Sequence, residues 1–312
     1  MKPYFYAKFY SQAARKLGLK IKLHNAFLID IFYKKDKVRF YFAMCSKNNA
    51  VAHIITKYKN MTNEFLKKNN VPVFEQKKFN NAKFSEILKY TKSLKFPVVV
   101  KPVAGLCGMG ITVNIINQSE LKKSIITATK IDKNIIIEKY YPGWDYRILI
   151  VNDKLLAVTK RFPASIIGDG VNSILKLINK KNKHLPKPVK IDQEVKDMLK
   201  SKKLTLKSIL PLNKTLYLRF RANAALGGTT ENVNIKTVHP DNIKISMKAV
   251  KLLNLKLAGL DLMTTDITKS YKKTGAGVTE INDNPATDIH MTATVNPIKD
   301  IGEQVLINLL KI

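Results

Sequence analysis

Alternating apolar and polar positions along the chain predict a mixture of strands and helices. Val38, Phe40 and Phe42 recur with the period of two that is typical of a half-buried strand. Strands are expected at 20–33, 37–43, 97–102, 111–116, 134–138, 145–151, 154–160, 257–263 and 277–282, and helices at 10–18, 60–69, 84–94, 118–129, 241–254 and 298–311. Asn152 and Asp153 predict a hairpin turn. Because strands and helices mix without strict βαβ order, the pattern indicates an α+β fold.

Charge is the unusual feature of the composition. The 312 residues include 55 Lys and Arg against 23 Asp and Glu, a formal net charge of +32, and only six of the bases are Arg. The Lys residues are spread along the whole chain, which favours a compositional bias over one dedicated surface. The polar segment 172–209, expected to be a helix with a mobile loop, holds eleven Lys. Attraction to an anion, such as a nucleotide, a nucleic acid or an acidic peptide, is the alternative.

Several classes of protein are not expected. The apolar runs are far shorter than the roughly 18 residues of a membrane span, and the first ten residues have no apolar signal-peptide core. Cys45 and Cys107 are isolated, so neither a disulfide framework nor a paired-cysteine metal site is expected. A reducing, cytoplasmic location follows as the default. No nucleic-acid recognition motif accompanies the charge, so nucleic acid is not an expected partner.

A strand that ends in Lys101 leads into a loop with three glycines, Gly105, Gly108 and Gly110. Glycine lets backbone N–H groups approach a phosphate closely, and Lys101 would add a point charge. The spacing matches neither a Walker A loop nor a dinucleotide-binding fingerprint. Taken alone, the segment also fits a structural turn.

Oxygen-bearing side chains mark two further strands. Glu280 and Asn282 are two positions apart, so they face the same side of their strand, and Asp261 lies on another expected strand. These oxygens suit Mg²⁺ that holds substrate phosphates. A polar strand end that leads into a turn is the alternative.

The apolar strand 134–138 ends in the polar sequence Glu138, Lys139 and Tyr140. Such a strand end can act as a hinge whose backbone binds an adenine while a nearby carboxylate binds a ribose. An edge strand that runs into solvent is the alternative.

The order of these motifs resembles the ATP-grasp superfamily of carboxylate–amine ligases, from about Lys59 to the C-terminus. Within it, residues 161–171, 219–223, 227–229 and 238–241 are similar to the ATP-grasp parts of cyanophycin synthetases and of the bifunctional glutamate–cysteine ligase/glutathione synthetase. The resemblance implies two α+β subdomains that clasp ATP. It divides the chain into a small segment 1–57 and an ATP-grasp domain 58–312, with a lid subdomain of about 82–140 and a C-terminal subdomain of about 141–312.

Each motif position acquires an implied role from the resemblance. The ATP-binding set is Lys59, Lys101, Gly105, Gly108, Gly110, Glu138, Lys139, Tyr140 and Asp145. The implied metal ligands are Asp261, Glu280 and Asn282, and the implied catalytic positions, facing the phosphates and the activated carboxylate, are Arg147, Arg219 and Asn223. The segment 161–170 corresponds to a loop beside the acceptor site. His239 and His290 are interpreted as a turn residue and a wall residue, because no second histidine pairs with either.

The implied activity joins an amino-acid or peptide carboxylate to an amine, in the manner of cyanophycin synthetases, glutathione synthetases or ribosomal-protein glutamate ligases. It uses ATP and Mg²⁺, for which Mn²⁺ can substitute. A carboxylate becomes an acyl phosphate, and an amine then displaces phosphate, so no protein nucleophile is needed; Cys107 is interpreted as a small loop residue. The carboxylate substrate could be acidic, and related ligases form homo-oligomers. The chain has neither the long N-terminal domain nor the Mur-ligase-like domain of cyanophycin synthetases, which favours one addition over polymerisation. A non-catalytic ATP-binding or interaction protein on the same fold is the alternative.

Overall fold

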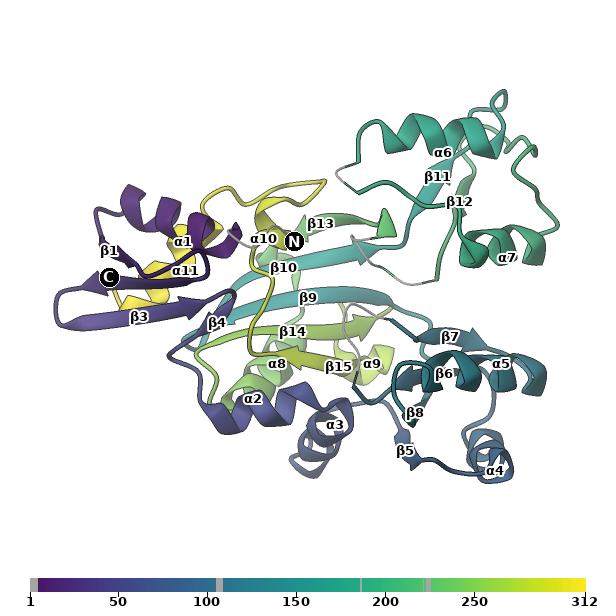
Figure 1. Ribbon diagram of the computed structural model, residues 1–312, viewed down its shortest axis with the longest axis horizontal. Helices are drawn as coiled ribbons and strands as arrows, with labels where there is room; N and C mark the ends of the chain where they lie inside the picture. The colour runs from purple at the N-terminus through teal and green to yellow at the C-terminus, as the bar shows by residue number, and fades with distance from the viewer. Residues whose placement is uncertain (1–4, 105–108, 186, 221, 223–225) are drawn as a thin grey trace.

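The computed structural model describes residues 5–104, 109–185, 187–220, 222 and 226–312, with the elements labelled in Figure 1. Within these ranges the strands form four sheets, and every pair of neighbouring strands is antiparallel. Helices lie against the sheets rather than alternating with them (Figure 1). The predicted α+β class is therefore confirmed.

A five-stranded sheet forms the centre of the molecule. Its order is β13-β10-β9-β14-β15, with β9 (Trp144–Val151), β10 (Lys154–Phe162), β13 (Thr229–Val233), β14 (Leu257–Thr264) and β15 (Gly277–Asn282). Asn152 and Asp153, both with positive φ, make the predicted turn between β9 and β10. Because β10 extends to Phe162, Arg161 lies on a strand, and the prediction that it belongs to a loop is wrong.

Helices cover one face of the central sheet. These are α2 (Ala50–Lys57), α3 (Lys59–Lys68) and α8 (Pro240–Leu252), next to the short η2 (Ile235–Thr237) and α9 (Tyr271–Thr274). Ile245, Ala249 and Val250 of α8 pack on the alternate, apolar positions of β9 and β14. The alternation assigns the neighbouring positions of the same strands to the opposite face, where the candidate site lies.

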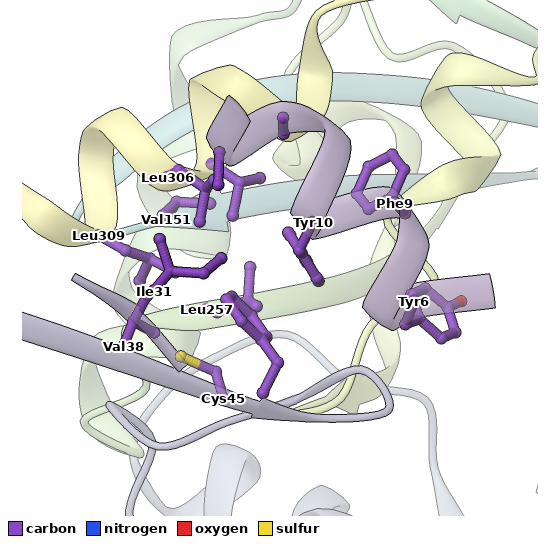
Figure 2. Close-up of a cluster of buried hydrophobic side chains, with 14 of the residues drawn as sticks. Tyr6, Phe9, Tyr10, Ile31, Val38, Cys45, Val151, Leu257, Leu306 and Leu309 are labelled. Atoms are coloured by element: carbon purple, nitrogen blue, oxygen red, sulfur yellow. The ribbon is translucent and has the colours of Figure 1, made fainter. Parts of the chain in front are cut away.

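The N-terminal elements cover one end of that opposite face. They comprise α1 (Phe5–Lys16), β1 (Lys20–Leu23), β2 (Leu28–Tyr33), β3 (Asp36–Tyr41) and β4 (Met44–Cys45), which pack with α10 (Asp288–Met291) and α11 (Ile301–Leu310). Figure 2 shows Tyr10 of α1 beside Val151 and Leu257 of the central sheet. The single strand expected at 20–33 is instead a hairpin, since Asn25 accepts the N–H groups of two following residues and turns the chain.

A second lobe lies at the other end of the central sheet (Figure 1). Its sheet has the order β5-β8-β6-β7, with β5 (Gln76–Asn80), β6 (Val98–Pro102), β7 (Thr112–Ile115) and β8 (Asn134–Lys139). The helices α4 (Phe84–Leu94) and α5 (Gln118–Thr129) cover it and close its own apolar core. β5 was not predicted, because most of its residues are polar and only its pairing with β8 makes it a strand.

A third lobe is built from the polar middle of the chain. It consists of β11 (Ser165–Ile167), α6 (Ile174–Asn182), α7 (Gln193–Ser201) and β12 (Thr215–Tyr217). Ile174, Ile178, Val195 and Leu199 form a separate core between its two helices. This segment therefore contains two packed helices where one helix and a mobile loop were expected. No helix in the described part of the chain is long and apolar enough to cross a membrane.

Candidate active site

A row of polar residues crosses the central sheet on the face opposite α8. Asn232, Thr159, Arg147, Asp261 and Glu280 are successive cross-strand partners from β13 to β15. Directly opposite residues of antiparallel strands point to the same face, so these five side chains form one continuous row. A β-bulge follows Asp261 in its pairing with β15. We call these five residues the polar ladder.

Two arginines and two aspartates form the densest part of the site. Arg147 Nε lies 2.6 Å from Asp261 Oδ1, while Arg161 Nη2 lies 2.8 Å from Asp261 Oδ2 and 2.6 Å from Asp145 Oδ1. Burial would raise the pKa of Asp261, but the two guanidinium groups outweigh it and hold the pKa below its usual value. The pKa of Asp145 is raised by burial and further by the negative charge of Asp261, and these effects outweigh Arg161, which lowers it. Asp145, predicted to bind ribose, is thus also an ion-pair partner within the sheet.

The implied metal ligands lie together at the β14–β15 edge. Glu280 is opposite Asp261, and its Oε1 lies 3.8 Å from Nζ of Lys59. Asn282 donates its amide N–H to the Gly259 carbonyl over 3.4 Å, which leaves Oδ1 as an acceptor. In the described ranges, no group of three or more His, Cys, Asp or Glu side chains is arranged to hold a metal ion. The set here is two carboxylates and an amide oxygen, the hard donors that suit Mg²⁺.

The second lobe contributes a buried ion pair. Lys101 on β6 and Glu138 on β8 lie 2.7 Å apart, and both side chains are almost fully buried. The backbone N–H groups of Lys139 and Tyr140 are donated to the carbonyls of Glu75 and Pro97. These two N–H groups of the expected adenine hinge are therefore already used within the fold.

The predicted phosphate loop is described only in part. Gly110 has a φ of 71°, and a side chain there would begin 3.0 Å from Ile131. Its positive φ favours glycine for reasons of local backbone geometry. Gly105 and Gly108, together with Cys107, lie outside the described residues.

Arg219 reaches the site from the third lobe. Its terminal nitrogens lie 2.5 Å from Glu194 and 2.7 Å from Asp192, and a third bond goes to the Lys190 carbonyl. The structure therefore uses these nitrogens to hold the start of α7, whereas the resemblance implied a role facing the phosphates. Asn223, the other implied catalytic residue nearby, lies outside the described residues.

A cavity of about 780 Å³ connects these groups. The predicted residues that line it are Lys59, Lys101, Glu138, Lys139, Tyr140, Asp145, Arg147, Arg219, Asp261, Glu280 and Asn282. Gly110 is not among the lining residues. The cavity also has an aromatic and apolar wall that was not predicted, formed by Phe74, Tyr141, Trp144, Met198 and Tyr217. These residues come from separate elements, so no local pattern marks them as neighbours.

His290 is fully buried behind the site, and its protonation state follows from its contacts. Asn232 donates its amide N–H groups to the backbone carbonyls of His290 and Asn296. The amide oxygen of Asn232 therefore faces Thr159 and accepts a hydrogen bond from the Thr159 hydroxyl. Thr159 Oγ1, 2.6 Å from Nδ1 of His290, must then accept the Nδ1–H. Nε2 carries the lone pair and has no partner among the described residues. Burial, helped by Arg147 and Arg161, lowers the pKa of His290 to about 3.

The other predicted histidine caps a helix. His239 precedes α8, and its Nδ1 accepts the backbone N–H of Asp241 over 3.1 Å. It is the N-cap residue of this helix, where a turn residue was expected. Cys45 is buried against the N-terminal core, and burial raises the pKa of its thiol to about 11.

Two family models match adjoining parts of the chain. Residues 63–208 match the model described as the D-ala D-ala ligase C-terminus, and residues 215–305 match the RimK-like ATP-grasp domain. Together they span the second lobe, the third lobe and most of the central sheet.

Named relatives and solved structures agree with these models. The cyanophycin synthetase of Trichormus variabilis is 30% identical over 305 residues, which is 94% of this chain and 33% of the relative. The glutathione biosynthesis bifunctional protein GshAB of Clostridium perfringens is 28% identical over 274 residues, 84% of this chain and 35% of the relative. The chain thus spans about a third of the length of these curated relatives. A bifunctional glutathione synthetase from Pasteurella multocida has the same fold, with a TM-score of 0.69 at 23% identity over 97% of this chain and 44% of that one.

Proposed function

We propose that this chain, which belongs to the ATP-grasp superfamily, is a Mg²⁺- and ATP-dependent ligase that joins a carboxylate to an amine. The observation that carries the proposal is that charged side chains of the central sheet and of the second lobe line the same cavity. Arg147, Asp261 and Glu280 of the polar ladder line one wall, and the Lys101–Glu138 pair of the second lobe lines another. A cavity between two lobes is the common place for a small-molecule site.

The cations of the cavity suit the phosphates of ATP. Lys59 and Lys101 each supply a compact positive charge, and Arg147 supplies a planar guanidinium beside them. We propose the lobe of residues 82–140 as the lid. Glu138, Lys139 and Tyr140 would line the adenine pocket through atoms other than the two backbone N–H groups already bonded within the fold, with Asp145 near the ribose. Phosphoryl transfer needs positioning and charge stabilisation rather than a covalent protein intermediate, which agrees with the residues in the cavity.

A divalent cation fits the chemistry of the β14–β15 edge. Asp261, Glu280 and Asn282 would hold Mg²⁺ through oxygen atoms, and Mn²⁺ accepts the same donors. When bound, the ion supplies positive charge next to the transferring phosphoryl group. Arg147 keeps Asp261 ionised and fixes its orientation, because its guanidinium donates to both carboxylate oxygens.

The reaction proceeds in two displacements. The substrate carboxylate attacks the γ-phosphorus of ATP, ADP leaves, and an acyl phosphate forms. The amine then attacks the acyl carbon, the amide forms, and the displaced phosphate carries away the amine proton. Removal of water from the buried cavity protects the acyl phosphate from hydrolysis.

We propose an amino acid or a peptide as the carboxylate substrate, and the third lobe as the region that selects it. The lysine-rich segment 172–209 borders the cavity through Met198 and Lys202, which suits an acidic substrate. Reversal of charge at exposed lysines of this lobe should raise the KM for such a substrate. An unchanged KM would count against the acidic class.

Release of ADP and phosphate from Mg·ATP tests the proposed activity. The panel contains single amino acids, glutamyl and aspartyl peptides, and γ-glutamylcysteine with glycine, each alone and in pairs, with mass spectrometry of the products. Pair-dependent release with a matching amide mass would establish the ligase. Binding of ATP without turnover of any pair, unchanged in Glu280→Gln, would favour a non-catalytic nucleotide-binding protein.

A further inference from the structure

The residue after the proposed metal ligand Asn282 is a buried carboxylate, Asp283. Its side chain is 8% exposed, and both oxygens have partners on α2. His53 Nδ1 lies 2.9 Å from Oδ2, and the hydroxyl of Thr56 donates to Oδ1 over 3.1 Å. A buried carboxylate is costly unless such partners satisfy it, so α2 and the end of β15 are held to one relative position.

Asn48 holds the backbone of the same residue. Its amide Nδ2 donates to the carbonyls of Asp283 over 2.7 Å and of Leu257 over 2.8 Å. Its Oδ1 accepts the N–H groups of Lys256 and Leu257. All four hydrogen bonds available to an Asn side chain are thus made, between the start of β14 and the end of β15.

The position of β15 explains why it needs this support. It is the last strand of the central sheet, paired through a ladder only with β14, and that ladder is interrupted by the bulge near Asp261. Among the described residues, its outer side carries one backbone bridge, from Val278 near its start to Val73. The end with Asn282 has no such bridge, and the contacts from residues 48–56 take its place.

The same segment continues directly to an implied ATP lysine. Lys59 begins α3, two residues after α2 ends, and its Nζ lies 3.8 Å from Glu280. The contacts on Asp283 therefore hold the neighbouring Asn282, whereas α3 has its own support in the buried Thr62 and Leu66.

We propose that Asn48, His53 and Thr56 form a clamp on Asp283 that positions Glu280 and Asn282 for a divalent cation. This Asp283 clamp rests on the proposed function, because it presumes that these two residues hold the metal. None of the three clamp residues lines the cavity, so they act as positioning residues through β15.

Binding of Mn²⁺ to the protein–ADP complex, followed by electron paramagnetic resonance, tests the clamp without turnover. The double variant His53→Ala/Thr56→Val removes both side-chain donors to Asp283. It should raise the Mn²⁺ dissociation constant about tenfold, as is usual when a partner behind a metal site is lost. The affinity for ADP without metal should stay unchanged, a separation that general destabilisation would not produce.

Conservative variants provide the matched comparison. His53→Asn keeps a donor near the Nδ1 position and Thr56→Ser keeps the hydroxyl, so both should bind Mn²⁺ like the wild type. His24→Ala removes a similar pair with Asp30, 3.1 Å long, in the N-terminal sheet and should also leave Mn²⁺ binding unchanged. If the double variant does not fold, Thr56→Val against Thr56→Ser gives the same comparison.

The outcomes separate the two proposals. Wild-type protein that binds Mn²⁺ and ADP, with a folded double variant that binds them equally well, would overturn the clamp and leave the proposed function standing. Wild-type protein that binds neither would overturn the proposed function and the clamp with it.

Discussion

Arg147 and Asp261 lie directly opposite each other on β9 and β14, and Arg147 Nε donates to Asp261 Oδ1 over 2.6 Å. Both side chains are buried at the base of the cavity. Cross-strand pairing brings together residues that are 114 positions apart in the sequence. The pair links a proposed phosphate-binding cation to a proposed metal ligand, so its loss should affect stability and activity together.

Replacement of Arg147 by Met should leave Asp261 with Arg161 as its charged partner. We expect the free energy of unfolding to fall by about 3 kcal/mol, because a buried carboxylate loses a partner. Turnover of ATP should fall about 100-fold, because a cation near the transferring phosphoryl group is lost. Urea unfolding and ADP release measure the two effects. Arg39→Met, which removes a similar contact with Asp30 far from the cavity, should leave turnover intact.

Glu280→Gln should separate activity from stability. The Glu280 side chain is 35% exposed, so the neutral isostere should leave the melting temperature almost unchanged. Turnover should fall by about 100-fold or more, because a metal ligand would be lost. Glu231→Gln, on β13 of the same sheet and outside the cavity lining, is the control. Equal activity of both variants would contradict the metal-binding role of Glu280.

Gly259 leaves room for the side chain of Arg147, which occupies the space that a Cβ would fill. A Cβ at this position would lie 2.9 Å from Arg147 Nη1 and 2.8 Å from Cβ of Pro285. Gly259→Ala should therefore displace the guanidinium and reduce turnover about tenfold, with a loss of about 1–3 kcal/mol in stability. The comparison is Gly302→Ala in α11, where the new Cβ would meet Ala13 and Phe9 at 3.1 Å. That variant should alter the melting temperature but not the KM for ATP.

The buried neutral His290 predicts a loss of stability in acid. Its pKa is lowered by burial to about 3, from the ordinary value of 6.5. Between these two pH values His290 is protonated in the unfolded chain but neutral in the folded protein. The contribution of neutral His290 to the free energy of unfolding is therefore complete above pH 6.5 and is lost as the pH falls through about 3. The slope from one proton is at most about 1.4 kcal/mol per pH unit.

His290→Asn tests this origin of the acid sensitivity. Asn can still donate to Thr159 but does not titrate, so its stability curve should be flatter over the same pH range. Urea unfolding at a series of pH values measures both curves. Parallel curves for wild type and variant would assign the acid sensitivity to other groups.

Local sequence patterns predicted most of the regular elements. The predicted ranges of α4, α5 and β15 match the structure residue for residue. The patterns failed for β5, β13 and the short strands of the third lobe. β5 and β13 are mostly polar, and β11 and β12 are only three residues long, so each is a strand only because a partner strand pairs with it.

For the candidate site, too, some features followed from local sequence and others depended on strand pairing. Spacing alone indicated that Glu280 and Asn282 share one face, and the order of motifs indicated which residues would meet in one cavity. Arg161, Thr159 and Asn232 were not identified as site residues, because their role depends on the cross-strand register. The contacts of Arg219 with Asp192 and Glu194 could not be predicted from the sequence either.

By itself, then, the sequence determined the α+β class, the main helices and strands, and the kinds of side chain available for ATP and Mg²⁺. These properties depend on residue type and on short-range periodicity, which the chain carries locally. Only the tertiary structure decided which charges neutralise each other and which face the cavity, and that Asn48, His53 and Thr56 support the end of β15. Such properties arise from tertiary contacts, across separations such as 16 positions for Asp145 and Arg161 and 230 for His53 and Asp283, and no local pattern encodes them.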